Sequence, residues 1–188
     1  MPPCRQWRGF SLIELMVVVA IMAVLASIAI PAYTSMMGNY RVKAATSDLV
    51  SDLAFARVEA IKQGLRVGVG APAAWKSGWV VFLDPGKDGL TVGTDDSGAN
   101  VFKTHPALRG TMSMCGKDPA GNNVAIDSIT YGGDGRLRLY NAGAAVPNDT
   151  SILITIAGSQ GGRSRLVSFS TIGRVSVEST SIPSETCP

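Results

Sequence analysis

The stretch GFSLIEL, residues 9–15, opens an apolar run that continues to Ile30. A run of this length can cross a bilayer as a helix, which needs about 20 apolar residues. Glu14 interrupts the run close to its beginning. Because a carboxylate is costly inside a membrane segment, its presence indicates a functional role. Snorkelling to the membrane surface is the alternative, since Glu14 lies about one helical turn from the start of the run.

The residues before the run have the basic start of an export signal, with Arg5 and Arg8 ahead of the apolar core. A secretory signal peptide has a core of roughly 7–15 residues, followed by a small-residue cleavage site. Here the core is longer and passes into residues 31–33 (PAY) without such a site. A retained anchor followed by a soluble domain is therefore the simplest interpretation.

Charge and cysteine usage depend on whether the first residues are kept. Lys and Arg number 17 against 14 Asp and Glu, and removing Arg5 and Arg8 leaves the two signs nearly balanced. Net charge then gives no argument for a nucleic-acid partner. Removing Cys4 as well leaves Cys115 and Cys187. Behind an export segment this pair predicts a disulfide formed in an oxidising compartment, and two unrelated buried thiols are the alternative.

Residues 34–63 are expected to continue as an amphipathic helix. Apolar residues recur there at spacings of three and four, while charged residues mostly lie off that stripe. The stripe consists of Val42, Ala45, Leu49, Leu53, Ala56 and Ala60. Gly64 is a natural stop for this helix.

From Leu65 the period changes toward two, and turn-forming clusters separate short β-rich runs. The expected strands cover residues 65–69, 79–83, 101–104, 108–114, 128–131, 136–140, 151–156, 165–170 and 174–177. The predicted fold class is α+β, with a long N-terminal helix packed on a C-terminal antiparallel β domain.

The sequence gives little support to enzymatic or metal chemistry. It lacks GxSxG, P-loop, HExxH and CxxC motifs, and His105 is its single histidine, so we predict no enzyme and no cofactor. Asp84, Asp88 and Asp95 match positions 1, 5 and 12 of a calcium loop, but position 3 is Gly86 and position 12 is not Glu. Turn chemistry explains the same residues. We therefore predict no metal site, with calcium at these three acids as the alternative.

The stretch GFSLIEL resembles the cleavage and methylation motif of type IV pilins and type II secretion pseudopilins. The resemblance implies that residues 1–9 are a leader, that a prepilin peptidase cuts after Gly9, and that Phe10 becomes an N-methylated N-terminus. Residues 10–33 would then be retained as a transmembrane and filament-core helix. In that family the acid at the position of Glu14 meets the free N-terminal amine of a neighbouring subunit, which would make it a docking and register device.

The resemblance also concerns Pro31. Pilin helices commonly carry a kink or a melted stretch at this place, and a proline in a helix interior removes one backbone hydrogen bond.

Four further motifs resemble the GspH/FimT group of minor pilins and pseudopilins. They are LAFARVEAI at 53–61, W…GWVVFLD at 75–84, ITY…GR at 129–136 and GRV at 173–175. The resemblance implies a low-abundance subunit that primes a pilus or sits at its tip and supports twitching motility, adhesion or DNA uptake. Its partners would be other pilins, the prepilin peptidase and the bacterial inner membrane, with residues 64–188 as a periplasmic β-rich domain. A minor pseudopilin of a type II secretion system is the alternative.

Some FimT-like proteins take up DNA and carry a C-terminal Gly-Arg-x-Arg motif. Residues 162–165 (GRSR) have this pattern, but the family position aligns better with residues 173–176, where serine replaces the second arginine. Arg163, Arg165 and Arg174 are thus the candidate contacts to DNA, and a solvated strand face is the alternative.

Overall fold

The computed structural model describes residues 10–95, 98–110, 112–147, 149–156, 164–170 and 172–180. The chain divides into two units, Met1–Met37 and Gly38–Pro188. Helix α1 (Leu12–Gln63) belongs to both units: its first half lies in the first unit and its second half lies in the second.

Helix α1 is 52 residues long and follows the boundaries that the sequence indicates. The carbonyl oxygen of Ser11 accepts hydrogen bonds from the N–H groups of Glu14 and Leu15 in the first turn. The helix ends before Gly64, which has a φ of +67° and so takes the left-handed conformation that terminates helices. Of the kink or melted stretch that the resemblance implies at Pro31, the melted stretch is not found, because the backbone is helical through this residue. A proline removes only one of the helix's hydrogen bonds, and the helix continues on both sides.

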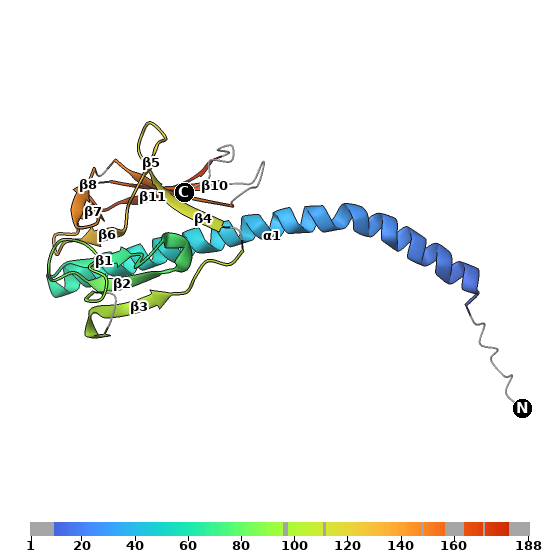
Figure 1. Ribbon diagram of the computed structural model, residues 1–188, viewed down its shortest axis with the longest axis horizontal. Coiled ribbons are helices and arrows are strands. Elements are labelled where there is room, and N and C mark those ends of the chain that lie inside the picture. The colour runs from blue at the N-terminus through green and yellow to red at the C-terminus, as the bar shows by residue number, and fades with distance from the viewer. Residues whose placement is uncertain are drawn as a thin grey trace, which may run out of the picture. The chain divides into compact units, whose positions relative to one another are not determined.

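The described part of the second unit forms two antiparallel sheets (Figure 1). The first has the order β3-β2-β1-β6-β7-β8, and the second has the order β11-β10-β9-β4-β5. The strands of the first sheet are β1 (Val67–Gly70), β2 (Trp79–Leu83), β3 (Val101–His105), β6 (Ser128–Tyr131), β7 (Leu137–Asn141) and β8 (Ala144–Val146). Those of the second are β4 (Met112–Lys117), β5 (Asn123–Val124), β9 (Ser151–Ile156), β10 (Ser164–Phe169) and β11 (Val175–Thr180). Two short 3-10 helices, η1 (Trp75–Ser77) and η2 (Gly98–Asn100), lie in the connections.

The α+β prediction is confirmed, and each expected strand overlaps a strand of the structure. Strands β5 and β8 were not predicted. They are two and three residues long, which is too short to produce an alternating pattern. Both extend an existing sheet at its edge, so neighbouring strands determine them more than their own residues do.

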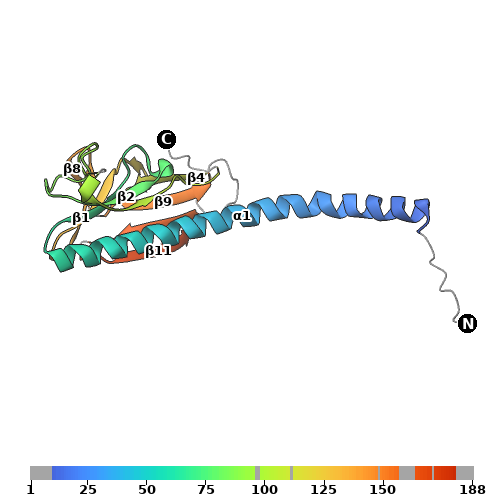
Figure 2. The ribbon, with the colours of Figure 1, turned by 90° about the horizontal axis from the view of Figure 1, so that it is seen from below.

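The second half of α1 runs alongside the sheets in both ribbon views (Figures 1 and 2). All six residues of the predicted apolar stripe are buried there, and Leu49 and Leu53 have no exposed surface. They share one core with side chains from both sheets, including Ile129, Ile154 and Val167. Each buried Val, Leu or Ile side chain of this core contributes roughly 1.5–3 kcal/mol by leaving water. This helix half is therefore an integral part of the β domain.

Candidate functional site

The first half of α1 presents an apolar surface that no other part of the described chain covers. Every residue from Phe10 to Ile30 is exposed, and Leu25, in the middle of this segment, has 61% of its surface exposed. Among the described residues, α1 is the one helix long and apolar enough to cross a membrane. A soluble protein rarely exposes an apolar patch of this extent, so the segment needs a lipid or protein environment.

Glu14 lies in the first turn of α1, where the helix dipole favours a negative charge. Its carboxylate has no hydrogen-bond or ion-pair partner among the described residues, and apolar side chains surround it along the sequence. Phe10 lies just before the helix and is 81% exposed. Gly9, the residue before the expected cut, lies outside the described residues. An acid on an otherwise apolar surface can select the one register in which a cation faces it.

Three motifs that lie far apart in the sequence meet at Arg57. Its guanidinium donates hydrogen bonds to the carbonyl oxygens of Ile172 (3.0 Å) and Gly173 (3.2 Å). Gly173 has a φ of +81°, and a Cβ at this residue would collide with the carbonyl oxygen of Gly135. It would also lie 3.2 Å from the ring of Tyr131, so only glycine fits here. Contacts of α1 with the β6–β7 and β10–β11 turns thus explain why these motifs occur together.

Tyr131 is the most strongly perturbed titratable group of this contact. Burial raises its pKa to about 12, and the positive charge of Arg57 opposes that shift. The phenol therefore stays neutral across the physiological range. This contact is structural: it fixes the turn that presents Arg174 to solvent.

Asp52 is a buried carboxylate that links α1 to β2 and β3. The indole N–H of Trp79 donates to its Oδ2 at 2.8 Å, and the ammonium of Lys103 pairs with its Oδ1. His105 stacks on Trp79 with ring centroids 3.8 Å apart, and its Nε2 lies 3.3 Å from a carboxylate oxygen of Asp48. These contacts place His105 in the packing of α1 on the first sheet.

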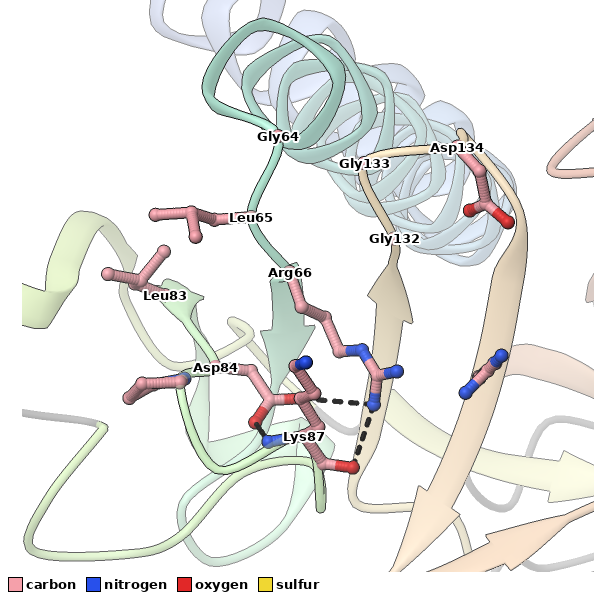
Figure 3. A pocket seen from close by; sticks show the side chains of 11 residues that line it. Gly64, Leu65, Arg66, Leu83, Asp84, Lys87, Gly132, Gly133 and Asp134 are labelled. Atoms are coloured by element: carbon pink, nitrogen blue, oxygen red, sulfur yellow. Dashed lines mark hydrogen bonds and ion pairs between the residues drawn. The ribbon is translucent and has the colours of Figure 1, made fainter.

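A pocket of about 300 Å³ lies between the end of α1 and two turns, residues 84–87 and 132–134 (Figure 3). The guanidinium of Arg66 donates to the carbonyl oxygen of Lys87 at 2.7 Å and faces the carboxylate of Asp84. The side chains of Lys87 and Arg138 have no partner among the described residues. The pocket therefore has unpaired positive charge and can accept a carboxylate or another small anion.

The three acids of the partial calcium loop do come together. One carboxylate oxygen each of Asp84, Asp88 and Asp95 lies within 4.8 Å of the others. Oδ1 of Asp84 accepts the N–H groups of Lys87 (2.6 Å) and Asp88 (3.3 Å), and its Oδ2 accepts a third N–H from the same turn. Burial raises the pKa of the Asp84 carboxyl, and these N–H donors oppose the shift. The hydrogen bonds explain Asp84 as a turn residue, and calcium binding stays a prediction.

The candidate DNA contacts do not form one group in the described part of the chain. Arg165 lies near the start of β10, paired with Ser179 of β11, whereas Arg174 lies at the turn that joins these two strands. The two arginines are therefore at opposite ends of the β10–β11 hairpin. Arg163 lies outside the described residues. DNA binding by these residues stays a prediction.

The predicted disulfide also reaches beyond the described residues. Cys115 lies in β4, opposite Leu153 of β9, and Cys187 lies outside the described part. The pairing of the two cysteines stays a prediction.

Sequence reasoning did not assign roles to Arg57, Asp52 or Lys103. Arg57 stands in a predicted motif and off the apolar stripe, which is the expected place of a solvated charge. Its two acceptors are backbone carbonyl oxygens more than 100 residues away, and no side-chain pattern marks such acceptors. Of these three residues, only Asp52 could have been identified from the sequence. It follows Leu49 by three residues, which places an acid on the buried side of the helix.

Two sequence families match this chain. Residues 45–173 match the family described as Type II transport protein GspH, and residues 8–30 match the prokaryotic N-terminal methylation motif. The first match covers most of the β domain with the helix half that belongs to it. The second covers the exposed apolar segment with Glu14.

Similar proteins include a type IV fimbrial protein and a prepilin peptidase-dependent protein. The Type IV major fimbrial protein FimA of Dichelobacter nodosus (strain VCS1703A) is 36% identical over 121 residues, which cover 63% of this chain and 72% of that protein. The Prepilin peptidase-dependent protein D of Escherichia coli (strain K12) is 56% identical over 43 residues, which cover 23% of this chain and 27% of that protein.

The fold is also that of a known pilin. The crystal structure of the type IV minor pilin FimU of Pseudomonas aeruginosa (strain PAO1) superposes with a TM-score of 0.52 at 23% identity, covering 78% of this chain and 92% of that one. A second crystal form of FimU gives a TM-score of 0.50. With its methylation motif, exposed apolar helix and GspH region, the chain belongs to the type IV pilin proteins, in the GspH family.

Proposed function

We propose that this chain is a minor pilin that primes the assembly of a type IV pilus or occupies its tip. The observation that carries the proposal is the fully exposed apolar half of α1 with one unpartnered acid, Glu14, in its first turn. Such a surface suits packing among identical or related helices, where an unpaired carboxylate penalises every incorrect register. The role is structural and needs no catalytic residue.

Maturation follows the methylation motif. A prepilin peptidase removes residues 1–9 by cutting after Gly9, and the new N-terminus at Phe10 becomes N-methylated. Cleavage at this place creates a cation at the start of the apolar helix. In the filament, the carboxylate of Glu14 then pairs with the N-terminal amine of a neighbouring subunit. Before assembly, residues 10–33 hold the chain in the bacterial inner membrane as a single span, with the β domain in the periplasm.

Membership in the GspH-like family and the similarity to the FimU fold favour a minor subunit over a major one. The similar protein FimA is named a major fimbrial protein, so the number of copies of this chain in a filament distinguishes a minor subunit from a major one. Quantitative immunoblots of sheared filaments are expected to find far fewer copies of this chain than of the main subunit. Equal abundance would contradict the minor role.

A minor pseudopilin of a type II secretion system is the second candidate, because the matching family is described as a type II transport protein. Deleting the gene and comparing surface piliation with secretion of exported enzymes separates the two. We expect loss of pili with intact secretion. Loss of secretion with normal pili would instead assign the chain to the secretion machinery, and a strain unaffected in both would contradict each candidate.

A further inference from the structure

A second pocket, of about 250 Å³, lies between α1 and the segment that joins β3 to β4. Most of its lining is apolar and comes from both elements: Ala44, Ala45, Pro106, Ala107, Leu108 and Met112. Arg41 lines the pocket from α1, and Arg109 lines it from the joining segment. The pocket lies wholly within the unit Gly38–Pro188.

The two arginines give this pocket unbalanced positive charge. Both are exposed, and among the described residues neither has a hydrogen-bond or ion-pair partner. A guanidinium nitrogen of Arg41 lies against the backbone of Gly110, the residue next to Arg109, so Arg41 reaches across to the segment that carries Arg109. The one acid of the lining, Asp48, already faces His105 at 3.3 Å. A guanidinium group is well suited to phosphate oxygens, which it binds through two parallel N–H donors.

The position of Arg41 in the chain indicates where such a phosphate comes from. Arg41 follows Ile30, the end of the apolar run, by eleven residues of α1. Eleven residues are a short connection, so chain connectivity alone keeps Arg41 near the membrane surface that the apolar run leaves.

We propose that this pocket binds the phosphate of an anionic glycerophospholipid head group on the periplasmic side of the membrane. The volume suits a head group but not acyl chains, and the apolar lining accommodates the glycerol carbons next to the phosphate. Bound lipid holds the β domain at the bilayer while the subunit waits for assembly, and leaving the membrane for the filament requires its release. The inference rests on the single-span topology proposed above.

Native mass spectrometry of the full mature chain, extracted in mild detergent and supplied with phosphatidylglycerol, tests the proposal. We expect one retained phosphatidylglycerol on the unmodified chain and at least about a fivefold loss in the double variant Arg41→Gln/Arg109→Gln, because the neutral amides lose the charge-assisted hydrogen bonds to phosphate. The matched control is Arg136→Gln/Arg174→Gln, which removes two exposed arginines outside the pocket and is expected to retain the lipid. Thermal unfolding of both variants verifies that they fold.

Competing ligands distinguish the sources of the phosphate. Phosphatidylethanolamine is expected to be retained more weakly, because its ammonium is repelled by the arginines, and inorganic phosphate is expected not to displace phosphatidylglycerol. Displacement by inorganic phosphate would overturn a lipid site. Equal lipid retention in the double variant would also overturn the lipid site. If that variant were in addition incorporated less into filaments, the arginines would be assigned to an acidic protein partner. Carbonate extraction tests the topology separately: a chain released from membranes contradicts the proposed function rather than this pocket alone.

Discussion

The two halves of helix α1 are both rich in apolar residues, yet they have opposite surroundings. Residues from Phe10 to Ile30 are exposed throughout, whereas six apolar residues between Val42 and Ala60 are buried in the core of the β domain. The first half is apolar on all sides, which suits lipid or a helix bundle. The second half confines its apolar residues to one stripe, which suits packing on a single partner. The spacing of apolar residues along a helix therefore indicates whether the helix packs on its own domain or is surrounded by lipid or by other helices.

The largest expected difference between the two halves is the loss of stability when one leucine in each is truncated to alanine. Leu53→Ala removes a side chain with no exposed surface and is expected to lower the free energy of unfolding by about 2–5 kcal/mol, since it leaves a cavity. Leu25→Ala removes an exposed side chain of the first half and is expected to change it by less than about 0.5 kcal/mol. Denaturant unfolding of the full chain in detergent measures both. Similar losses in the two variants would show that the first half also packs on the β domain.

Glycine substitutions test how the second half fixes a distant turn. Gly173→Ala is expected to cost about 2–4 kcal/mol, because it adds a strained left-handed alanine and a collision with the Gly135 carbonyl oxygen beside Arg57. The matched control is Gly64→Ala, which has a similar positive φ but no atom within 4 Å of the new Cβ. That variant is expected to cost only about 1–2 kcal/mol. Thermal unfolding of the two variants side by side measures the difference, and equal costs would refute the close contact.

The smallest effect concerns Tyr131, whose pKa burial raises to about 12. In the unfolded chain the phenol ionises near pH 10. The native state therefore holds this proton more tightly, and the stability it contributes is present below about pH 10 and lost as the pH rises toward 12. Ultraviolet titration of the phenolate is expected to show a late step that disappears in Tyr131→Phe. A single step near pH 10 for all tyrosines would contradict the burial.

Much of this architecture could be predicted from the sequence. The stripe from Val42 to Ala60 predicts the buried face of α1, Gly64 predicts its end, and period-two runs predict nearly all of the strands. These features succeed because burial and backbone conformation act on each residue through its close neighbours in the chain. The same reasoning identified Glu14, because an acid within an apolar run is conspicuous without any structure.

The remaining features depend on contacts between distant segments. Arg57 bonds to carbonyl oxygens near Gly173, and backbone acceptors carry no residue signature. Arg41 and Arg109 share a pocket although 68 positions separate them in the sequence. At Pro31 the resemblance leaves both a kink and a melted stretch open, because one missing hydrogen bond does not determine which of them occurs, and the structure has a helical backbone there.

Incorporation of Glu14→Gln into filaments tests the assembly role of the exposed helix half most directly. The amide has nearly the shape of the acid but lacks its charge, and losing one partner of a buried ion pair costs about 3–5 kcal/mol. Immunoblots of membranes and of sheared filaments should find the variant in membranes at the normal level and in filaments at least about tenfold depleted. Glu59→Gln, an acid in the second half of the same helix, is the control and should be incorporated normally. Normal incorporation of Glu14→Gln would contradict the pairing of this acid with a neighbour's N-terminus.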